Sequence, residues 1–221
     1  MNLFGLSVCW SACRDVRPYG VNALSIPGES NLHSTKKAMG FMDIEPIEVL
    51  AEGKYLKLVK AGCWEYADRT RGIRAVAIVA VTRNQELILT EQFRVPIGKP
   101  VIDLPAGLVG DEAGQEDEAD ELAARRELLE ETGFEARTLK PIVSGPTTAG
   151  MATEIVTIYL ATGVRQVNAG GGVTGEEIQV HVVPLTKVMS WLKRSARDGK
   201  LIDVKTHFAA AWLVEKHKAR N

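Results

Sequence analysis

Hydrophobic and polar positions change their period several times along the chain, and each change predicts a different element. KYLKLVKAGCWEYADR, at 54–69, alternates apolar and polar side chains, which is typical of half-buried strands or a hairpin. RAVAIVAV, at 74–81, is a continuous β-branched run, as in a strand buried on both faces. ELILTEQF, at 86–93, follows after TRNQ and predicts a hairpin turn there. VIDLPAGL, at 101–108, predicts a strand that enters a Pro/Gly turn.

The second half of the chain predicts two more strands, one loop and two helices. The strand-like runs are IVTIYLATGV at 155–164 and IQVHVVPL at 178–185. Between them, NAGGGVTGEE at 168–177 predicts a flexible, glycine-rich loop. Apolar residues recur at helical spacing at 185–197 and 203–217. With an acidic helix between the two halves, this order predicts an α/β (α+β) fold in which helices pack on a mixed β-sheet.

Residues 1–45 differ from the rest, because they are rich in Gly, Pro, Ser and Asn and show no period. They predict a loosely ordered leader, followed by one domain over 46–221 whose N-terminal strands occupy 46–72. The three cysteines are irregularly spaced, which argues against a disulfide framework and a zinc site. No apolar run approaches the roughly 20 residues of a transmembrane helix, and no clear signal peptide is present. We therefore expect a cytoplasmic protein.

Charge is balanced over the whole chain but not locally. The 27 Lys and Arg nearly cancel the 28 Asp and Glu, so the net charge of -1 favours neither nucleic-acid nor membrane-surface binding. Residues 111–131, in contrast, are strongly acidic. They predict a helix from Gln115 to Thr132, which Gly133 would end in a left-handed conformation.

The segment RRELLEETGF, at 125–134, places three carboxylates in five residues: Glu127, Glu130 and Glu131. At about 100° per residue they project together, while Leu122 and Leu129 lie opposite and would pack on a sheet. Like charges at this spacing destabilise a helix, and acidic groups in its last turn oppose the helix dipole. A hard divalent cation would compensate for both effects. The helical pattern alone leaves a solvated acidic face and a metal site equally open.

The flanking residues change that balance. LPAGLVG followed by RRELLEETGF resembles the Nudix hydrolase signature, and the pattern from Glu118 to Phe134 is complete. Ten residues separate Gly107 from Glu118 where the signature has five, so we expect a Nudix box over 107–134 with a five-residue insertion. LTEQFRVPIGKPVIDLPAGLV is similar to the ADP-ribose pyrophosphatase branch, as is the closing pattern EEIQVHVVPL. SGPTTAGMATE resembles that branch's SPGxxxE loop, with Ala149 where proline is common.

The resemblance implies an α/β/α Nudix sandwich with an N-terminal β-hairpin used in homodimerisation. It implies that Glu127 and Glu131 are metal ligands, with Glu130 close by and the backbone carbonyl of Ala106 as an additional ligand. The implied cofactor is Mg²⁺, or Mn²⁺ in its place. Several Mg²⁺ ions would neutralise an anionic pyrophosphate, activate a water and stabilise the leaving phosphate.

Further roles follow from the same resemblance. Arg126 would orient the glutamates by ion pairing, and Gly107 would let the backbone approach metal and phosphate closely. Arg94 is placed to contact a phosphate. The general base would come from the loop with Glu176 and Glu177, and we prefer Glu176 because Glu177 abuts a strand. The alternative, two surface glutamates at the end of a loop, remains open.

The pair Trp64 and Glu65 would stack on adenine and hydrogen-bond to it, in one interpretation across a dimer. A tryptophan that covers a dimer core is the alternative. We expect Mg²⁺-dependent hydrolysis of a nucleotide sugar, with ADP-ribose giving AMP and ribose 5-phosphate. Other substrates that the sequence leaves open are GDP-mannose, ADP-glucose and NADH. An alternative of another class is a catalytically silent Nudix domain that senses a nucleotide.

Overall fold

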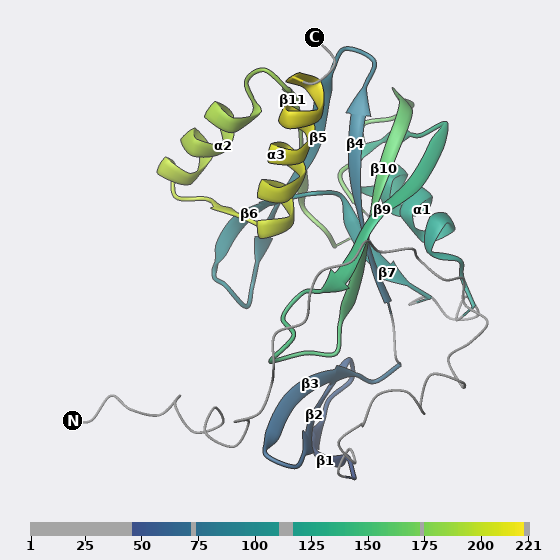
Figure 1. Ribbon diagram of the computed structural model, residues 1–221, viewed down its shortest axis with the longest axis vertical. Coiled ribbons are helices and arrows are strands. Elements are labelled where there is room, and N and C mark those ends of the chain that lie inside the picture. Colours follow the sequence, from purple (N-terminus) through teal and green to yellow (C-terminus); the bar gives the residue numbers. More distant parts are fainter. Residues whose placement is uncertain (1–45, 72–73, 111–116, 173–174, 219–221) are drawn as a thin grey trace, which may run out of the picture.

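The computed structural model describes residues 46–71, 74–110, 117–172 and 175–218 of the 221-residue chain. The expected leader over 1–45 and residues 111–116 of the expected insertion lie outside this described part. A broad sheet forms the body, with helices on both faces and a smaller sheet below it (Figure 1). No helix among the described residues is long and apolar enough to cross a membrane.

The elements follow the predicted order, with five strands that the sequence did not predict separately (β1, β7, β8, β9 and β12). The strands are β1 (Glu48–Glu52), β2 (Leu56–Ala61), β3 (Trp64–Arg69), β4 (Arg74–Thr82), β5 (Glu86–Arg94), β6 (Lys99–Asp103), β7 (Ala106–Val109), β8 (Phe134–Glu135), β9 (Thr138–Pro146), β10 (Ile155–Gln166), β11 (Ile178–Pro184) and β12 (Leu201–Ile202). The helices are α1 (Asp120–Thr132), α2 (Val188–Arg197) and α3 (Val204–Lys218).

The main sheet has nine strands and mixes parallel and antiparallel pairs, which confirms the predicted α+β class. Its central order is β12-β6-β5-β4-β10-β8, with β11 also on β5, β7 on β4 and β9 on β10. The pairs β4–β10 and β6–β12 are parallel, and the other pairs of this sheet are antiparallel. Strand β10 therefore pairs with one edge of β4, and the other edge of β4 is divided between β5 and β7.

Strand β4 shows why its sequence is apolar without interruption. Ala77 and Val79 belong to the core under α2 and α3, whereas Val76 and Ile78 belong to the core under α1. All four are fully buried. Because successive side chains of a strand point to opposite faces, a strand covered on both sides needs apolar residues at every position. Figure 1 shows α2 and α3 on one side of the sheet and α1 on the other, so the expected α/β/α sandwich is confirmed.

Helix α1 begins at Asp120, five residues later than the sequence predicted, and Ala119 precedes it. Its end is as predicted: Gly133 has a φ of 73° and its N–H bonds to the carbonyl of Leu129 at 2.8 Å. The expectation that Leu122 packs on the sheet is wrong, because its side chain is 59% exposed.

The buried residues of α1 explain that error. Ala123, Ala124 and Leu128 are fully buried, and Glu131 of the same helix is only 8% exposed. The carboxylates therefore share the sheet-facing side of α1 with the apolar residues. The prediction of an apolar face opposite an anionic face is wrong for this reason.

Strand β9 was not predicted, because TLKPIVSGP contains two prolines and no clear alternation. It pairs with β10 alone, so it lies at an edge of the sheet. Proline is tolerated on edge strands because the missing N–H is not needed for a second ladder.

The predicted N-terminal strands form a separate three-stranded antiparallel sheet, β1-β2-β3. This small sheet contacts the segment 147–154 of the same chain. The N–H of Ala67 bonds to the carbonyl of Met151 at 2.8 Å, and Arg69 pairs with Glu154. The use of these strands in dimerisation stays a prediction.

Candidate active site

The candidate site lies where the strands of the main sheet diverge. Strand β5 pairs with β4 at only two positions, Ala80 with Ile88 and Val81 with Leu87. The first half of β4 pairs with β7 instead. This divergence separates the end of β5 from β7, and α1 closes one side of the gap. A cavity of about 490 Å³ opens there, a size typical of small-molecule sites.

The cavity brings together six residues that the sequence singled out from distant segments. They are Arg94, Ala106, Gly107, Glu127, Glu131 and Glu176. Polar residues to which the sequence gave no role also line it. They are Arg69, Gln92, Asp103, Thr147, Glu154 and Lys205. Gln92, Asp103, Thr147 and Glu154 lie in segments that carry the resemblance, and Glu154 ends the segment that resembles SPGxxxE.

Gly107 lies directly against Glu127. A Cβ atom at Gly107 would lie 2.0 Å from both Cδ and Oε1 of the Glu127 side chain. Any residue other than glycine would therefore displace this carboxylate. Glycine is needed here for a close approach of the backbone to an acidic side chain, and the predicted approach to metal and phosphate stays a prediction.

Glu131 is a buried carboxyl group among other charges. The backbone N–H of Ala106 donates a hydrogen bond to its Oε2 at 3.0 Å. Burial raises the pKa of Glu131 to about 8; the negative charges of Glu127 and Glu176 add to the rise, while Arg94 opposes it. These four charged groups thus act on one another inside a single cavity, where a cation would relieve the repulsion among three carboxylates.

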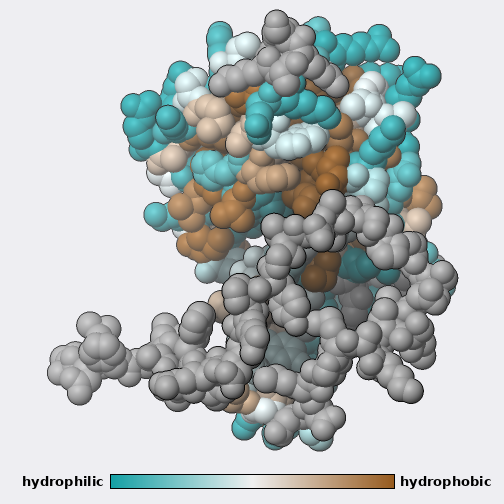
Figure 2. Space-filling view, viewed as in Figure 1, coloured by the Kyte–Doolittle hydropathy of each residue, from teal (hydrophilic) through white to brown (hydrophobic). Residues whose placement is uncertain are grey.

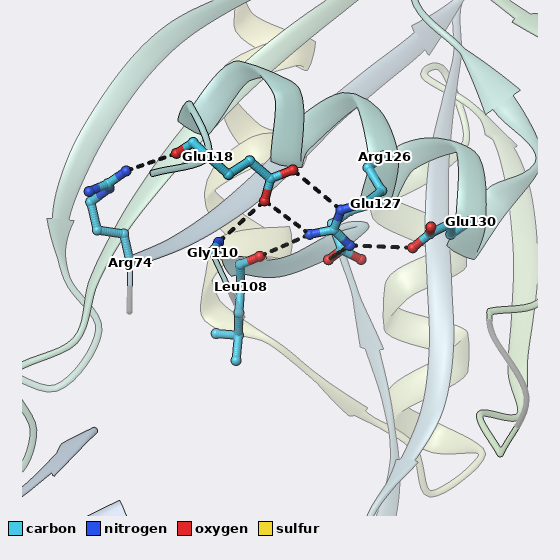
Figure 3. A network of polar contacts seen from close by, with 7 residues as sticks. All are labelled: Arg74, Leu108, Gly110, Glu118, Arg126, Glu127 and Glu130. Carbon is cyan, nitrogen blue, oxygen red and sulfur yellow. Dashed lines mark hydrogen bonds and ion pairs between the residues drawn. The ribbon is translucent and has the colours of Figure 1, made fainter. Parts of the chain in front are cut away.

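Arg126 is held by several acceptors at once (Figure 3). It donates to Glu127 at 2.8 Å, to Glu130 at 3.4 Å and to the carbonyl of Leu108 at 3.2 Å. Its contacts with the Glu118 carboxylate are 3.4 Å long. Burial opposes the charge, but the pairing with Glu118 and Glu127 outweighs it and raises the pKa of Arg126. The guanidinium therefore fixes the Glu127 carboxylate and links α1 to β7.

The loop at 168–172, which we call the glycine clip, caps α1. The N–H groups of Gly171 and Gly172 donate to the carbonyls of Glu131 and Glu130 at 2.9 Å and 3.0 Å. These carbonyls lie in the last turn, where a helix has no internal donors for them. The glycine clip thus supplies backbone hydrogen-bond donors to the end of α1 that carries Glu130 and Glu131.

The same clip positions Glu176. A Cβ atom at Gly172 would lie 2.7 Å from Oε2 of Glu176, so the carboxylate rests against this glycine. Glu177 points elsewhere and lines a different cavity together with Glu91 and Phe93. The two neighbouring glutamates, of which the sequence favoured Glu176, therefore lie in different surroundings.

Five predicted residues are not among those that line the main cavity: Glu130, Arg126, Glu177, Trp64 and Glu65. Glu130 contacts Arg126 beside the cavity. Trp64 and Glu65 lie at the start of β3, and the Trp64 side chain is 55% exposed. Within one chain these two residues do not meet the acidic cluster.

The donor set of the cavity fits a hard divalent cation, because it consists of carboxylate and backbone carbonyl oxygens. Glu127, Glu131 and Glu176 supply carboxylates and Ala106 lines the same cavity, while the use of its backbone carbonyl as a ligand stays a prediction. Across the described ranges, no three His, Cys, Asp or Glu side chains already converge as a metal cage. Side-chain rotation would therefore accompany binding of a metal.

Comparison with known proteins agrees with this geometry. A family model described as the NUDIX domain matches residues 72–203. A methanol dehydrogenase activator from Bacillus methanolicus is 31% identical over 140 residues, which cover 63% of this chain and 71% of that protein. An ADP-ribose pyrophosphatase from Bacillus subtilis (strain 168) is 33% identical over 140 residues, with the same coverage.

Two further similarities concern substrate and fold. A GDP-mannose pyrophosphatase from Enterobacter sp. (strain 638) is 32% identical over 141 residues, which cover 60% of this chain and 71% of that protein. A crystal structure described as an ADP compounds hydrolase superposes with a TM-score of 0.60 at 21% identity. It covers 79% of this chain and 94% of that structure, and so supports the fold.

Proposed function

The chain belongs to the Nudix family, and on that premise we propose that it hydrolyses the pyrophosphate bond of a nucleoside diphosphate linked to a sugar. The single observation that carries the proposal is the cavity in which Arg94 faces three carboxylates, two of them on the helix of the Nudix box. ADP-ribose is the substrate that we favour, with AMP and ribose 5-phosphate as products. The similarity to an ADP-ribose pyrophosphatase supports this choice.

We assign the divalent cation, Mg²⁺ or Mn²⁺, to Glu127, Glu131 and the carbonyl of Ala106, with Glu130 nearby. When bound, the cation supplies positive charge that offsets the charge of the pyrophosphate. Burial of Glu131 supports the assignment, because a cation that binds there in exchange for the proton offsets the negative charge that burial disfavours.

The remaining residues of the cavity hold the substrate and move a proton. Arg94 binds a phosphate oxygen, since a guanidinium donates two parallel hydrogen bonds to such a group. Arg126 holds the Glu127 carboxylate in place and does not touch the substrate. Glu176 is the general base that accepts a proton from the attacking water at its carboxylate. Its place in the cavity with Glu131 supports it over Glu177.

The N-terminal sheet supports a homodimer in this proposal. It exposes apolar side chains that a second copy would cover, including Val49, Leu56, Leu58 and Trp64. Trp64 and Glu65 would then meet adenine in the partner's cavity or cover the dimer core. We place the reaction in the cytoplasm, because irregularly spaced cysteines are typical of that compartment.

A substrate panel tests the proposal. Purified protein with Mg²⁺ is assayed against ADP-ribose, ADP-glucose, GDP-mannose and NADH, and kcat/KM is compared. We expect ADP-ribose to give the highest value. GDP-mannose is the second candidate, because a relative of similar identity is a GDP-mannose pyrophosphatase. Tight binding without hydrolysis of any compound would favour a nucleotide sensor and overturn the enzymatic proposal.

A further inference from the structure

A second cavity, of about 430 Å³, adjoins the catalytic cavity. The two share three lining residues, which are Thr147, Val156 and Lys205. The second cavity lies between β9, β10 and the first turns of α3. Its apolar walls are formed by Val143, Pro146, Ile158, Val204 and Phe208. Hydrophobic side chains are visible on the face of the body that carries α3 and β9 (Figure 2).

The ammonium group of Lys205 is held by ion pairs where the two cavities meet. Lys205 Nζ lies 2.7 Å from Oδ1 of Asp203 and 3.3 Å from Oδ2 of Asp103. Asp203 also accepts a hydrogen bond from the backbone N–H of Lys205 at 2.8 Å, as a capping residue does at the start of a helix. Burial opposes the charge of Lys205, but both aspartates outweigh it and raise the pKa of this group. Lys205 and Asp203 thus line the second cavity together with its apolar walls.

Strand β3 and helix α3 are among the elements that line the catalytic cavity. Arg69 of β3 lines it from the N-terminal sheet, and Lys205 lines it from the start of α3. A diphosphate substrate carries one substituent on each phosphate. With the phosphates at Glu127 and Glu131, one of the two substituents has room toward Lys205 and the second cavity, because the two cavities share that wall.

We propose that this second cavity, the sugar cavity, holds the sugar on the second phosphate and sets the preference among nucleotide sugars. The inference rests on the proposed function. A sugar ring has C–H faces that pack on apolar walls such as Phe208, and hydroxyl groups that need polar partners. Lys205 donates to a hydroxyl and Asp203 accepts from one. A few polar groups in an apolar pocket are the usual arrangement for orienting a small ligand.

Phe208→Ala tests the sugar cavity, because Phe208 is 42% exposed and lies outside the catalytic cavity. Two substrates are compared: ADP-ribose, and an ADP ester that carries only a methyl group on the second phosphate. We expect kcat/KM for ADP-ribose to fall about 10-fold, with the methyl ester unchanged. Val204→Trp, at a position that is 77% exposed, should fill the cavity with the same selectivity and little effect on folding. Met189→Ala on α2 is the control with neither effect.

A binding measurement separates this inference from the proposed function. The dissociation constant of ribose 5-phosphate is measured by calorimetry for the wild-type protein and both variants. Weaker binding in both variants supports the sugar cavity even if the wild type hydrolyses no substrate. Unchanged binding, or an equal loss of kcat/KM for both substrates, overturns the sugar cavity and leaves the proposed function intact.

Discussion

The backbone N–H of Gly171 donates a hydrogen bond to the carbonyl oxygen of Glu131 at 2.9 Å. Through this bond the loop after β10 holds the end of the helix that carries the box glutamates. The side chain of Glu176 rests on the next glycine of the same loop. The glycine clip therefore ties the proposed general base to the proposed metal ligands, although some 45 residues separate them in the sequence.

Gly170→Ala should displace the glycine clip from the end of α1. A Cβ atom at Gly170 would lie 2.2 Å from the carbonyl carbon of Thr132, and the φ of 66° also disfavours a side chain. We expect the free energy of unfolding to fall by about 1–3 kcal/mol and kcat to fall by about 10-fold. Urea unfolding and steady-state kinetics measure both. Gly199→Ala is the matched control, with a φ of 89° and no atom within 4 Å. Equal kcat in the two variants would refute a role of the clip in catalysis.

Stability without metal should depend on the pH through Glu131. Its pKa is about 8 in the folded protein, against an ordinary value of 4.5. Between these values the folded protein binds more protons than the unfolded chain, so the free energy of unfolding decreases as the pH rises from about 4.5 to about 8. Denaturant titrations in EDTA measure this slope. Glu131→Gln should reduce it, because glutamine does not ionise. The same slope in the variant would show that Glu131 is not its source.

Arg126→Lys should impair catalysis without weakening substrate binding. A lysine cannot reach Glu118, Glu127 and the carbonyl of Leu108 together, because it lacks the planar fork of a guanidinium. We expect kcat to fall by about 10–100-fold, a higher Mg²⁺ requirement, and a nearly unchanged KM. Arg125→Lys is the control on the same helix, since Arg125 pairs with Glu121 and donates to the carbonyl of Ala136, and it does not line the cavity. A raised KM with normal kcat would instead point to direct contact with the substrate.

Glu176→Gln and Glu177→Gln distinguish the two candidate bases. Loss of a general base typically costs about 10²–10⁴-fold in rate. We expect a loss in this range for Glu176→Gln and a change below about threefold for Glu177→Gln, whose side chain lines another cavity. The acidic limb of the pH–rate profile should also disappear in Glu176→Gln alone. The reverse pattern would move the proton transfer to Glu177.

Local patterns in the sequence predicted the parts of the fold that depend on local chemistry. The apolar run at 74–81 correctly predicted a central strand, and Gly133 correctly predicted the end of α1. The prediction of which face of α1 packs on the sheet was wrong. Periodicity shows which residues share a side of a helix, but it does not show which side meets the sheet. Leu122 is exposed and Glu131 is buried, since the carboxylate belongs to the cavity.

Residues of the cavity that come from distant segments were harder to predict. Arg94 and the box glutamates had motifs around them, whereas Arg69 and Lys205 sit in ordinary amphipathic segments. Their place depends on how β3 contacts the segment 147–154 and how Asp203 caps the start of α3. No spacing in the chain encodes those contacts, so only the assembled structure shows them.

The central claim is that the buried carboxylate of Glu131 supports metal-dependent hydrolysis of a nucleotide diphosphate. The most direct test compares kcat/KM for ADP-ribose between the wild-type protein and Glu131→Gln over a titration of Mg²⁺. Glutamine keeps the size of the side chain and removes its charge. We predict a loss of more than about 100-fold that added Mg²⁺ does not restore. Equal kcat/KM values for the two proteins would contradict the account.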